Sequence, residues 1–128
     1  MACTDVTGFG LIGHLLEMCT QSKVKVTVHL EQVPLYEGAK DCVEMGIESS
    51  LQKANLRLRR AVKTSDAVRS HPAYPLLFDP QTSGGLLASL PKDYAEQCVK
   101  ELRQANIDAA LIGEVTGAQQ DHEVIHVL

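Results

Sequence analysis

Several features are scarce in this chain of 128 residues. It contains no tryptophan, two phenylalanines and three tyrosines, so it has little material for a surface on which nucleic-acid bases could stack. Its formal net charge of −4 also disfavours binding along a phosphate backbone. No apolar run is long enough to cross a bilayer, and no basic-then-apolar leader is found. These absences predict a cytoplasmic protein with neither a nucleic-acid nor a membrane partner.

Paired cysteines are also missing. The four cysteines are widely and irregularly spaced, without a Cys-x-x-Cys pair, which argues against a zinc site and against a disulfide framework (Cys3, Cys19, Cys42 and Cys98). Cys19 and Cys98 fall on the apolar faces of predicted helices, so we expect them to be small core residues.

The length fits one domain, residues 1–128, and apolar periodicity predicts its elements. We expect helices from about residue 10, over 37–45, from Ser49 or Ser50, and over 92–104, with strands over 24–30, after Gly85, over 109–115 and over 124–128. The third helix should face inward with Leu51, Ala54, Leu58 and Val62, and residues 64–74 should be irregular. This order predicts an α/β protein of the α+β type, with one mixed sheet covered by helices.

The first chemical motif runs from Thr4 to His14 and reads as a loop that turns into a helix. Thr7 is the expected N-cap, while Gly8 and Gly10 leave the first turn open to an anion. Asp5 could hold a divalent cation that bridges to that anion, or it could only cap the helix. His14, Glu17 and Gln21 are expected on the wetter face of the helix, with His14 in a structural role.

The same motif contains Gly8-x-Gly10-x-x-Gly13, the letters of a dinucleotide-binding turn. That turn needs a buried strand before its first glycine, and residues 1–7 offer an absent or stunted one. Dinucleotide binding is therefore the weaker alternative.

The second chemical motif spans Leu77 to Pro91. Asp79-Pro80 enforces extended or turn geometry, and Gly84-Gly85 allows backbone N–H groups to face a ligand. From the residues alone, a tight turn and an anion-binding loop containing Thr82 and Ser83 fit equally well.

A third feature is a basic cluster on the predicted helix after Ser50, formed by Arg57, Arg59, Arg60 and Lys63. Such a cluster is usually a solvated helix face, and contact with phosphate is the alternative.

The two motifs, together with Ile112-Gly113-Glu114-Val115, resemble the C-terminal half of selenophosphate synthetase (selenide, water dikinase) in order and spacing. The wider superfamily also includes aminoimidazole ribonucleotide (AIR) synthetase, thiamine-monophosphate kinase and a hydrogenase-maturation protein. The run Asp79-Pro80-Gln81-Thr82-Ser83-Gly84-Gly85 favours selenophosphate synthetase.

The resemblance implies a two-domain, magnesium-dependent enzyme that makes selenophosphate from ATP, selenide and water and releases AMP and phosphate. It implies that the ATP loop, the reactive Cys or Sec with its Lys, and most metal-binding aspartates lie in an N-terminal domain that this chain lacks. Cys3 is not that nucleophile, and no catalytic residue is assigned here. Asp5 is the implied magnesium ligand, and the residues expected to line the ATP cleft are Thr7, Gly8, Gly10, Thr82, Ser83, Gly84 and Gly85.

Three further expectations follow from the resemblance. The chain alone should bind magnesium weakly and show no turnover, and the full-length protein should be a homodimer built mainly through the other domain. A non-catalytic binding or regulatory module with the same fold is the alternative function.

Overall fold

A computed structural model describes all residues, 1–128. Its main sheet has four strands in the order β3 (Val62–Lys63), β6 (Ile125–Val127), β2 (Val24–Val28) and β5 (Gly113–Ala118). Strand β2 runs antiparallel to β5 and parallel to β6, and β3 is parallel to β6, so the sheet is mixed. A separate antiparallel ribbon joins β1 (Ala2–Asp5) to β4 (Leu86–Ser89).

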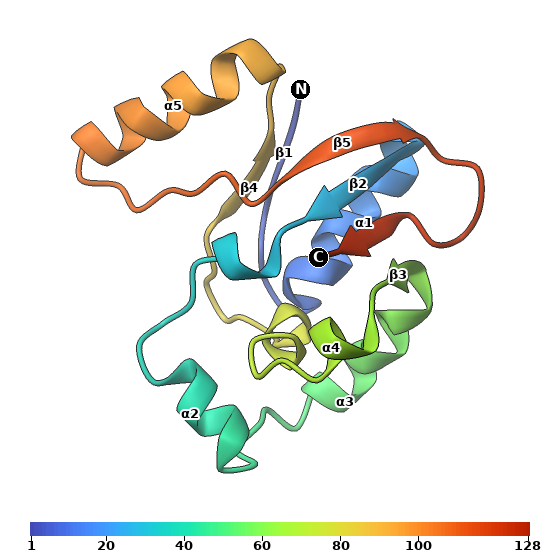
Figure 1. Ribbon diagram of the computed structural model, residues 1–128. Helices are drawn as coiled ribbons and strands as arrows, with labels where there is room; N and C mark the ends of the chain where they lie inside the picture. The colour runs from blue at the N-terminus through green and yellow to red at the C-terminus, as the bar shows by residue number, and fades with distance from the viewer.

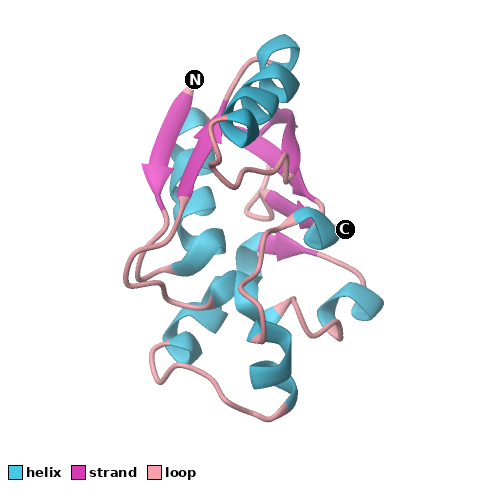
Figure 2. Cartoon of the chain, turned by 90° about the vertical axis from the view of Figure 1, so that its left-hand side faces the viewer, coloured by secondary structure: helices cyan, strands magenta, loops and turns pink.

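Helices pack around these strands (Figures 1 and 2). The α-helices are α1 (Gly10–Ser22), α2 (Ala39–Glu44), α3 (Gln52–Asn55), α4 (Asp66–Arg69) and α5 (Lys92–Gln104). Three 3-10 helices complete the set, η1 (Leu30–Gln32), η2 (Leu56–Ala61) and η3 (Pro75–Phe78). The mixed sheet flanked by helices confirms the predicted α+β fold. None of the helices combines the length and the apolar character that crossing a bilayer requires.

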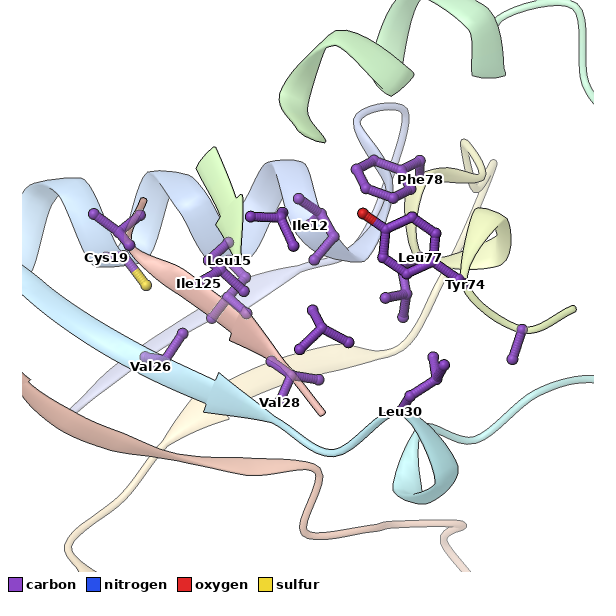
Figure 3. Packing of buried hydrophobic residues seen from close by; sticks show 14 residues of the cluster. Ile12, Leu15, Cys19, Val26, Val28, Leu30, Tyr74, Leu77, Phe78 and Ile125 are labelled. Atoms are coloured by element: carbon purple, nitrogen blue, oxygen red, sulfur yellow. The ribbon is translucent and has the colours of Figure 1, made fainter. Parts of the chain in front are cut away.

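The core lies between α1, the main sheet and η3. Ile12, Leu15 and Cys19 recur at helical spacing on α1 and are buried, as the sequence pattern predicts. They meet Val26, Val28, Leu30, Val62, Ile125 and Val127 from the sheet side and Tyr74, Leu77 and Phe78 from η3 and the residue before it (Figure 3). The Tyr74 and Phe78 rings pack edge to face with centroids 5.4 Å apart.

Two predictions about exposed faces were wrong, the one for α1 and a second that follows from the period-2 alternation of residues 24–30, which places Lys25, Thr27 and His29 on the solvated face. His14 is buried, although Glu17 and Gln21 are exposed as expected. Thr27, in the central strand β2, is also buried. His29 is half-buried rather than solvated.

The prediction of which residues of the third helix face inward was also wrong for the start of that helix. Leu51 and Ala54 are exposed, whereas the polar residues Gln52 and Asn55 are buried. The helix is short, changes to 3-10 geometry at Leu56, and ends before Val62, which is a buried residue of β3. A 3-10 helix has three residues per turn, so the inner face follows Asn55, Leu58 and Ala61.

The remaining differences are local. Residues 64–74, expected to be irregular, contain the short helix α4, whose N-cap Ser65 accepts a hydrogen bond from the Val68 N–H. The strand expected over 109–115 begins at Gly113 and continues to Ala118. Helix α5 and β6 form where the sequence pattern places them, but α5 has no buried residue.

Candidate functional site

The two chemical motifs, distant in the sequence, form one structural unit. The β1–β4 ladder pairs Asp5 with Leu86 and Thr4 with Leu87. Beyond the ladder, the Val6 N–H donates to the Gly85 carbonyl at 2.9 Å, and the Gly84 N–H donates to the Val6 carbonyl at 3.0 Å. The Gln81 N–H then donates to the Thr7 carbonyl at 3.0 Å. These bonds place Asp5–Gly10 beside Gln81–Leu86, and we call the combined segment the paired loops.

Asn55 fastens the paired loops to the core. Its side-chain amide donates to the Gly8 carbonyl at 2.9 Å and to the Phe78 carbonyl at 3.1 Å. Both bonds come from one buried amide nitrogen, so a single residue ties the first motif to the start of the second. Sequence reasoning missed this residue; the polar pair Gln52-x-x-Asn55 at helical spacing was the available signal.

Two of the glycines are explained by packing within this chain. Gly10 has φ +70°, and a Cβ there would lie 2.8 Å from the Phe78 carbonyl carbon. A Cβ on Gly84 would collide with the Val6 carbonyl oxygen. These two glycines let the paired loops approach each other closely.

Gly8 and Gly85 are different. A Cβ on either residue would meet no atom within 4 Å, neither has a positive φ, and both are exposed. The packing of this chain therefore gives no reason for the absence of a side chain at these two positions. They border open space beside the paired loops, where a ligand could approach the backbone closely.

Asp5 is exposed at the end of β1. Apart from the ladder, a bond from the Thr4 hydroxyl, 3.4 Å long, reaches its main-chain carbonyl rather than its carboxylate. No group of three His, Cys, Asp or Glu side chains in the structure is arranged to hold a metal ion. Asp5 could thus supply one oxygen ligand to magnesium, which needs six, so the remaining ligands would have to come from outside this chain.

Thr7 does not cap helix α1, and that prediction was wrong. The N-cap residue is Phe9, which makes no side-chain capping bond. The Thr7 hydroxyl instead lies 3.1 Å from Nε2 of His14. The main-chain carbonyl of Thr7 accepts a hydrogen bond from the Gly10 N–H at 3.0 Å. The hydroxyl is therefore already engaged by a side chain of the helix that it was expected to cap.

The polar residues of the second loop lie at the surface. Thr82 and Ser83 are exposed, and Asp79, half-buried, accepts a bond of 2.8 Å from the Gln81 side-chain amide. Burial raises the pKa of the Asp79 carboxyl, and the Gln81 bond opposes that rise. The basic cluster is exposed too, with Arg59 Nε donating to the Leu56 carbonyl at 3.1 Å.

The geometry does not match a dinucleotide-binding turn. Such a turn follows a buried parallel strand, whereas β1 is half-exposed and runs antiparallel to β4. Gly13 has a packing reason, because a Cβ there would collide with Cβ of Phe9.

One cavity borders α5 and the main sheet rather than the paired loops. It has a volume of about 550 Å³ and is mainly apolar, and its walls come from α1, β2, β4, α5 and β5. None of the predicted site residues lines it.

Comparison with known proteins places the chain in a family. The model of the AIR synthase related protein C-terminal domain family matches residues 1–126. The chain belongs to this family.

The relatives agree with the resemblance drawn from the motifs, which is confirmed. The chain is 41% identical to the selenide, water dikinase of Myxococcus xanthus over 125 residues, which cover 97% of the chain and 35% of the relative. It is 40% identical to the selenide, water dikinase of Treponema denticola over 133 residues, covering 98% and 36% respectively. That of Clostridium botulinum (strain Alaska E43) is 41% identical over 114 residues, covering 89% and 33%. The chain thus spans about a third of the length of these relatives.

Proposed function

We propose that this chain is the C-terminal domain of an ATP-dependent enzyme that makes selenophosphate from selenide, ATP and water and releases AMP and phosphate. In this proposal Asp5 is one magnesium ligand, and the paired loops form one wall of the ATP cleft. The other wall, with the nucleophile and the remaining metal ligands, belongs to an N-terminal domain, and the full-length enzyme is a cytoplasmic homodimer.

The observation that carries the proposal is the arrangement at the paired loops. An exposed carboxylate stands next to two glycines, Gly8 and Gly85, whose open surroundings have no packing explanation. A third of the length of proteins named selenide, water dikinase is matched at about 40% identity, which supports a role within that reaction.

The chemistry agrees with this division of labour. Phosphoryl transfer requires that negative charge on the transferred group be neutralised, and a bound magnesium ion supplies the positive charge that does so. Asp5 would hold the cation on this side of the cleft. Gly8 and Gly85 would bring backbone N–H groups, and Thr82 and Ser83 their hydroxyls, toward phosphate oxygens. Gly10 and Gly84, whose N–H groups donate to the Thr7 and Val6 carbonyls, would contribute by letting the two loops lie close together.

The test is Asp5→Asn in the full-length enzyme. The substitution keeps the shape of the side chain and removes its charge, so we expect ATP turnover to fall at least about 100-fold, as for the loss of a group acting on transition-state charge. Because Asp5 is exposed, the unfolding temperature should not change. Asp108→Asn, an exposed aspartate outside the paired loops, is the matched control and should keep full activity.

Unchanged turnover in Asp5→Asn would overturn the metal role. Turnover by the 128-residue chain alone would contradict the proposal that the other wall of the ATP cleft belongs to an N-terminal domain. Failure of a folded chain to restore turnover when mixed with a matching N-terminal domain would instead favour a non-catalytic module.

A further inference from the structure

His14 is a buried polar residue in a helix face that otherwise packs with apolar side chains. Its side chain is 9% exposed, and the Phe9 ring covers it, with ring centroids 5.8 Å apart. Nε2 lies 3.1 Å from the Thr7 hydroxyl. Nδ1 lies 3.3 Å from a carboxylate oxygen of Glu17, yet this contact does not have the geometry of a hydrogen bond, so the buried nitrogen has no hydrogen-bond partner.

Such a residue needs an explanation. Burying an imidazole lowers stability unless both nitrogens are satisfied, and an apolar residue of similar size would fill the same position without that penalty. The two polar neighbours of the imidazole connect different parts of the molecule: Thr7 belongs to the paired loops, and Glu17 is exposed one turn further along α1.

We propose that His14 is a positioning residue, which acts through the Thr7 hydroxyl on the ligand of the paired loops. The Glu17 carboxylate acts on the imidazole only through its charge, 3.3 Å from Nδ1, and the imidazole holds Thr7 through Nε2. The three residues form a chain from the helix surface to the loop, Glu17–His14–Thr7. This inference rests on the proposed function, because it assumes that the paired loops bind a ligand.

The series Glu17–His14–Thr7 also determines whether the Thr7 hydroxyl can donate a hydrogen bond to that ligand or accept one from it. The carboxylate beside Nδ1 favours the tautomer that carries its proton there, which leaves Nε2 as an acceptor. The Thr7 hydroxyl has one proton and donates it to Nε2, so only its lone pairs remain for a ligand. Thr7 therefore suits a cation or a hydrogen-bond donor rather than an unprotonated phosphate oxygen. With Asp5, the proposed magnesium ligand, two residues earlier, that group would be the magnesium ion or a water bound to it.

A pair of substitutions at His14 separates positioning from packing. The amide of Gln reaches about as far as Nε2 and can hold Thr7, whereas the amide of Asn stops near Nδ1 and cannot. In the full-length enzyme we expect His14→Gln to stay within about threefold of normal turnover. We expect His14→Asn to raise the magnesium concentration at half-maximal rate about 10-fold, as for the loss of a group that orients a metal site.

Thr7→Val completes the test. It removes the hydroxyl, so it should have the same effect as His14→Asn, and the double variant should be no worse than either single one. Additive effects would show that the two residues act independently and would overturn the proposal. Equal loss in the Gln and Asn variants would do the same, because it would assign His14 to packing alone.

Two measurements on the 128-residue chain need no turnover. In ¹⁵N NMR spectra that resolve the imidazole, the proton of His14 should reside on Nδ1, and a proton on Nε2 would contradict the proposed role of Thr7. His14→Leu should leave the unfolding temperature equal or higher, since it replaces a buried unpaired nitrogen; a marked fall would mean that His14 serves the fold. If Asp5→Asn abolishes turnover while His14→Asn changes nothing, this inference fails and the proposed function stands.

Discussion

Helices α1 and α5 have the same length, 13 residues, and both alternate apolar and polar residues at helical spacing, but the structure treats them differently. Helix α1 buries Ile12, Leu15 and Cys19 against the sheet and η3. Helix α5 buries nothing, and Figure 1 shows it at one edge of the molecule. Ala95 and Val99 on α5 face the apolar cavity instead of a packed core. An amphipathic pattern therefore predicts that a helix exists, and only tertiary packing decides what it contributes to stability.

The largest expected difference compares two leucines. Leu77 is 1% exposed in the core beside α1, and Leu102 is half-buried on α5. Leu77→Ala should lower the free energy of unfolding by about 2–5 kcal/mol, because it removes buried methyl groups and leaves a cavity. Leu102→Ala should lower it by about 1 kcal/mol or less. Urea denaturation checks both values, and equal losses would mean that α5 is packed as tightly as α1.

A smaller effect tests the attachment of the paired loops to the core. Asn55→Ala leaves the Gly8 and Phe78 carbonyls without their shared donor, and we expect a loss of about 1–3 kcal/mol. Lys53→Ala on the same helix is exposed and should change stability by less than about 0.5 kcal/mol. Limited proteolysis should also cut near Gly8 sooner in Asn55→Ala. Identical cleavage in both variants would show that Asn55 does not hold the loop.

The smallest expected difference is in the rate of alkylation of two thiols, one on each helix. Burial raises the pKa of Cys19 on α1 to about 11, so this thiol is protonated at pH 8 and should resist iodoacetamide. Half-buried Cys98 on α5 should react before Cys19 does, and exposed Cys3 should react first. Peptide mass mapping over time gives the order, and early labelling of Cys19 would show that the core opens readily.

The same pKa shift predicts a dependence of stability on pH. The folded protein holds the Cys19 proton more tightly than the unfolded chain, for which the reference pKa is 9.0. This contribution is therefore complete below about pH 9 and is lost as pH rises toward about 11. The free energy of unfolding should fall less over this range in Cys19→Ala than in the original chain.

Local periodicity predicted much of the fold because burial on one face leaves a regular pattern. It located α1, α5, β2 and β6. It failed at Leu51 and Ala54, because the tertiary contacts of Asn55 and Gln52, and not apolar spacing, decide which face of α3 is inside. It also failed at His14, whose polarity indicated an exposed face. The residue is buried instead, and its polar partner is Thr7, seven residues earlier.

The candidate site was accessible to sequence reasoning in a different way. Both loops and Asp5 were found from their glycines, hydroxyls and carboxylate, and from the resemblance. Their pairing was not predicted, because the β1–β4 ladder joins residues that lie roughly 80 positions apart in the sequence, beyond the reach of local periodicity. Sequence alone also could not separate Gly10 and Gly84, which the packing explains, from Gly8 and Gly85, which it leaves open.

The β1–β4 ribbon has a consequence for biosynthesis. A ribosome delivers β1 long before β4, so the first strand emerges with its partner still untranslated. During that interval its free edge can pair with strands of other nascent chains. Asp5, the carboxylate proposed to hold a cation in the finished enzyme, also puts a negative charge on that waiting edge and so discourages such encounters.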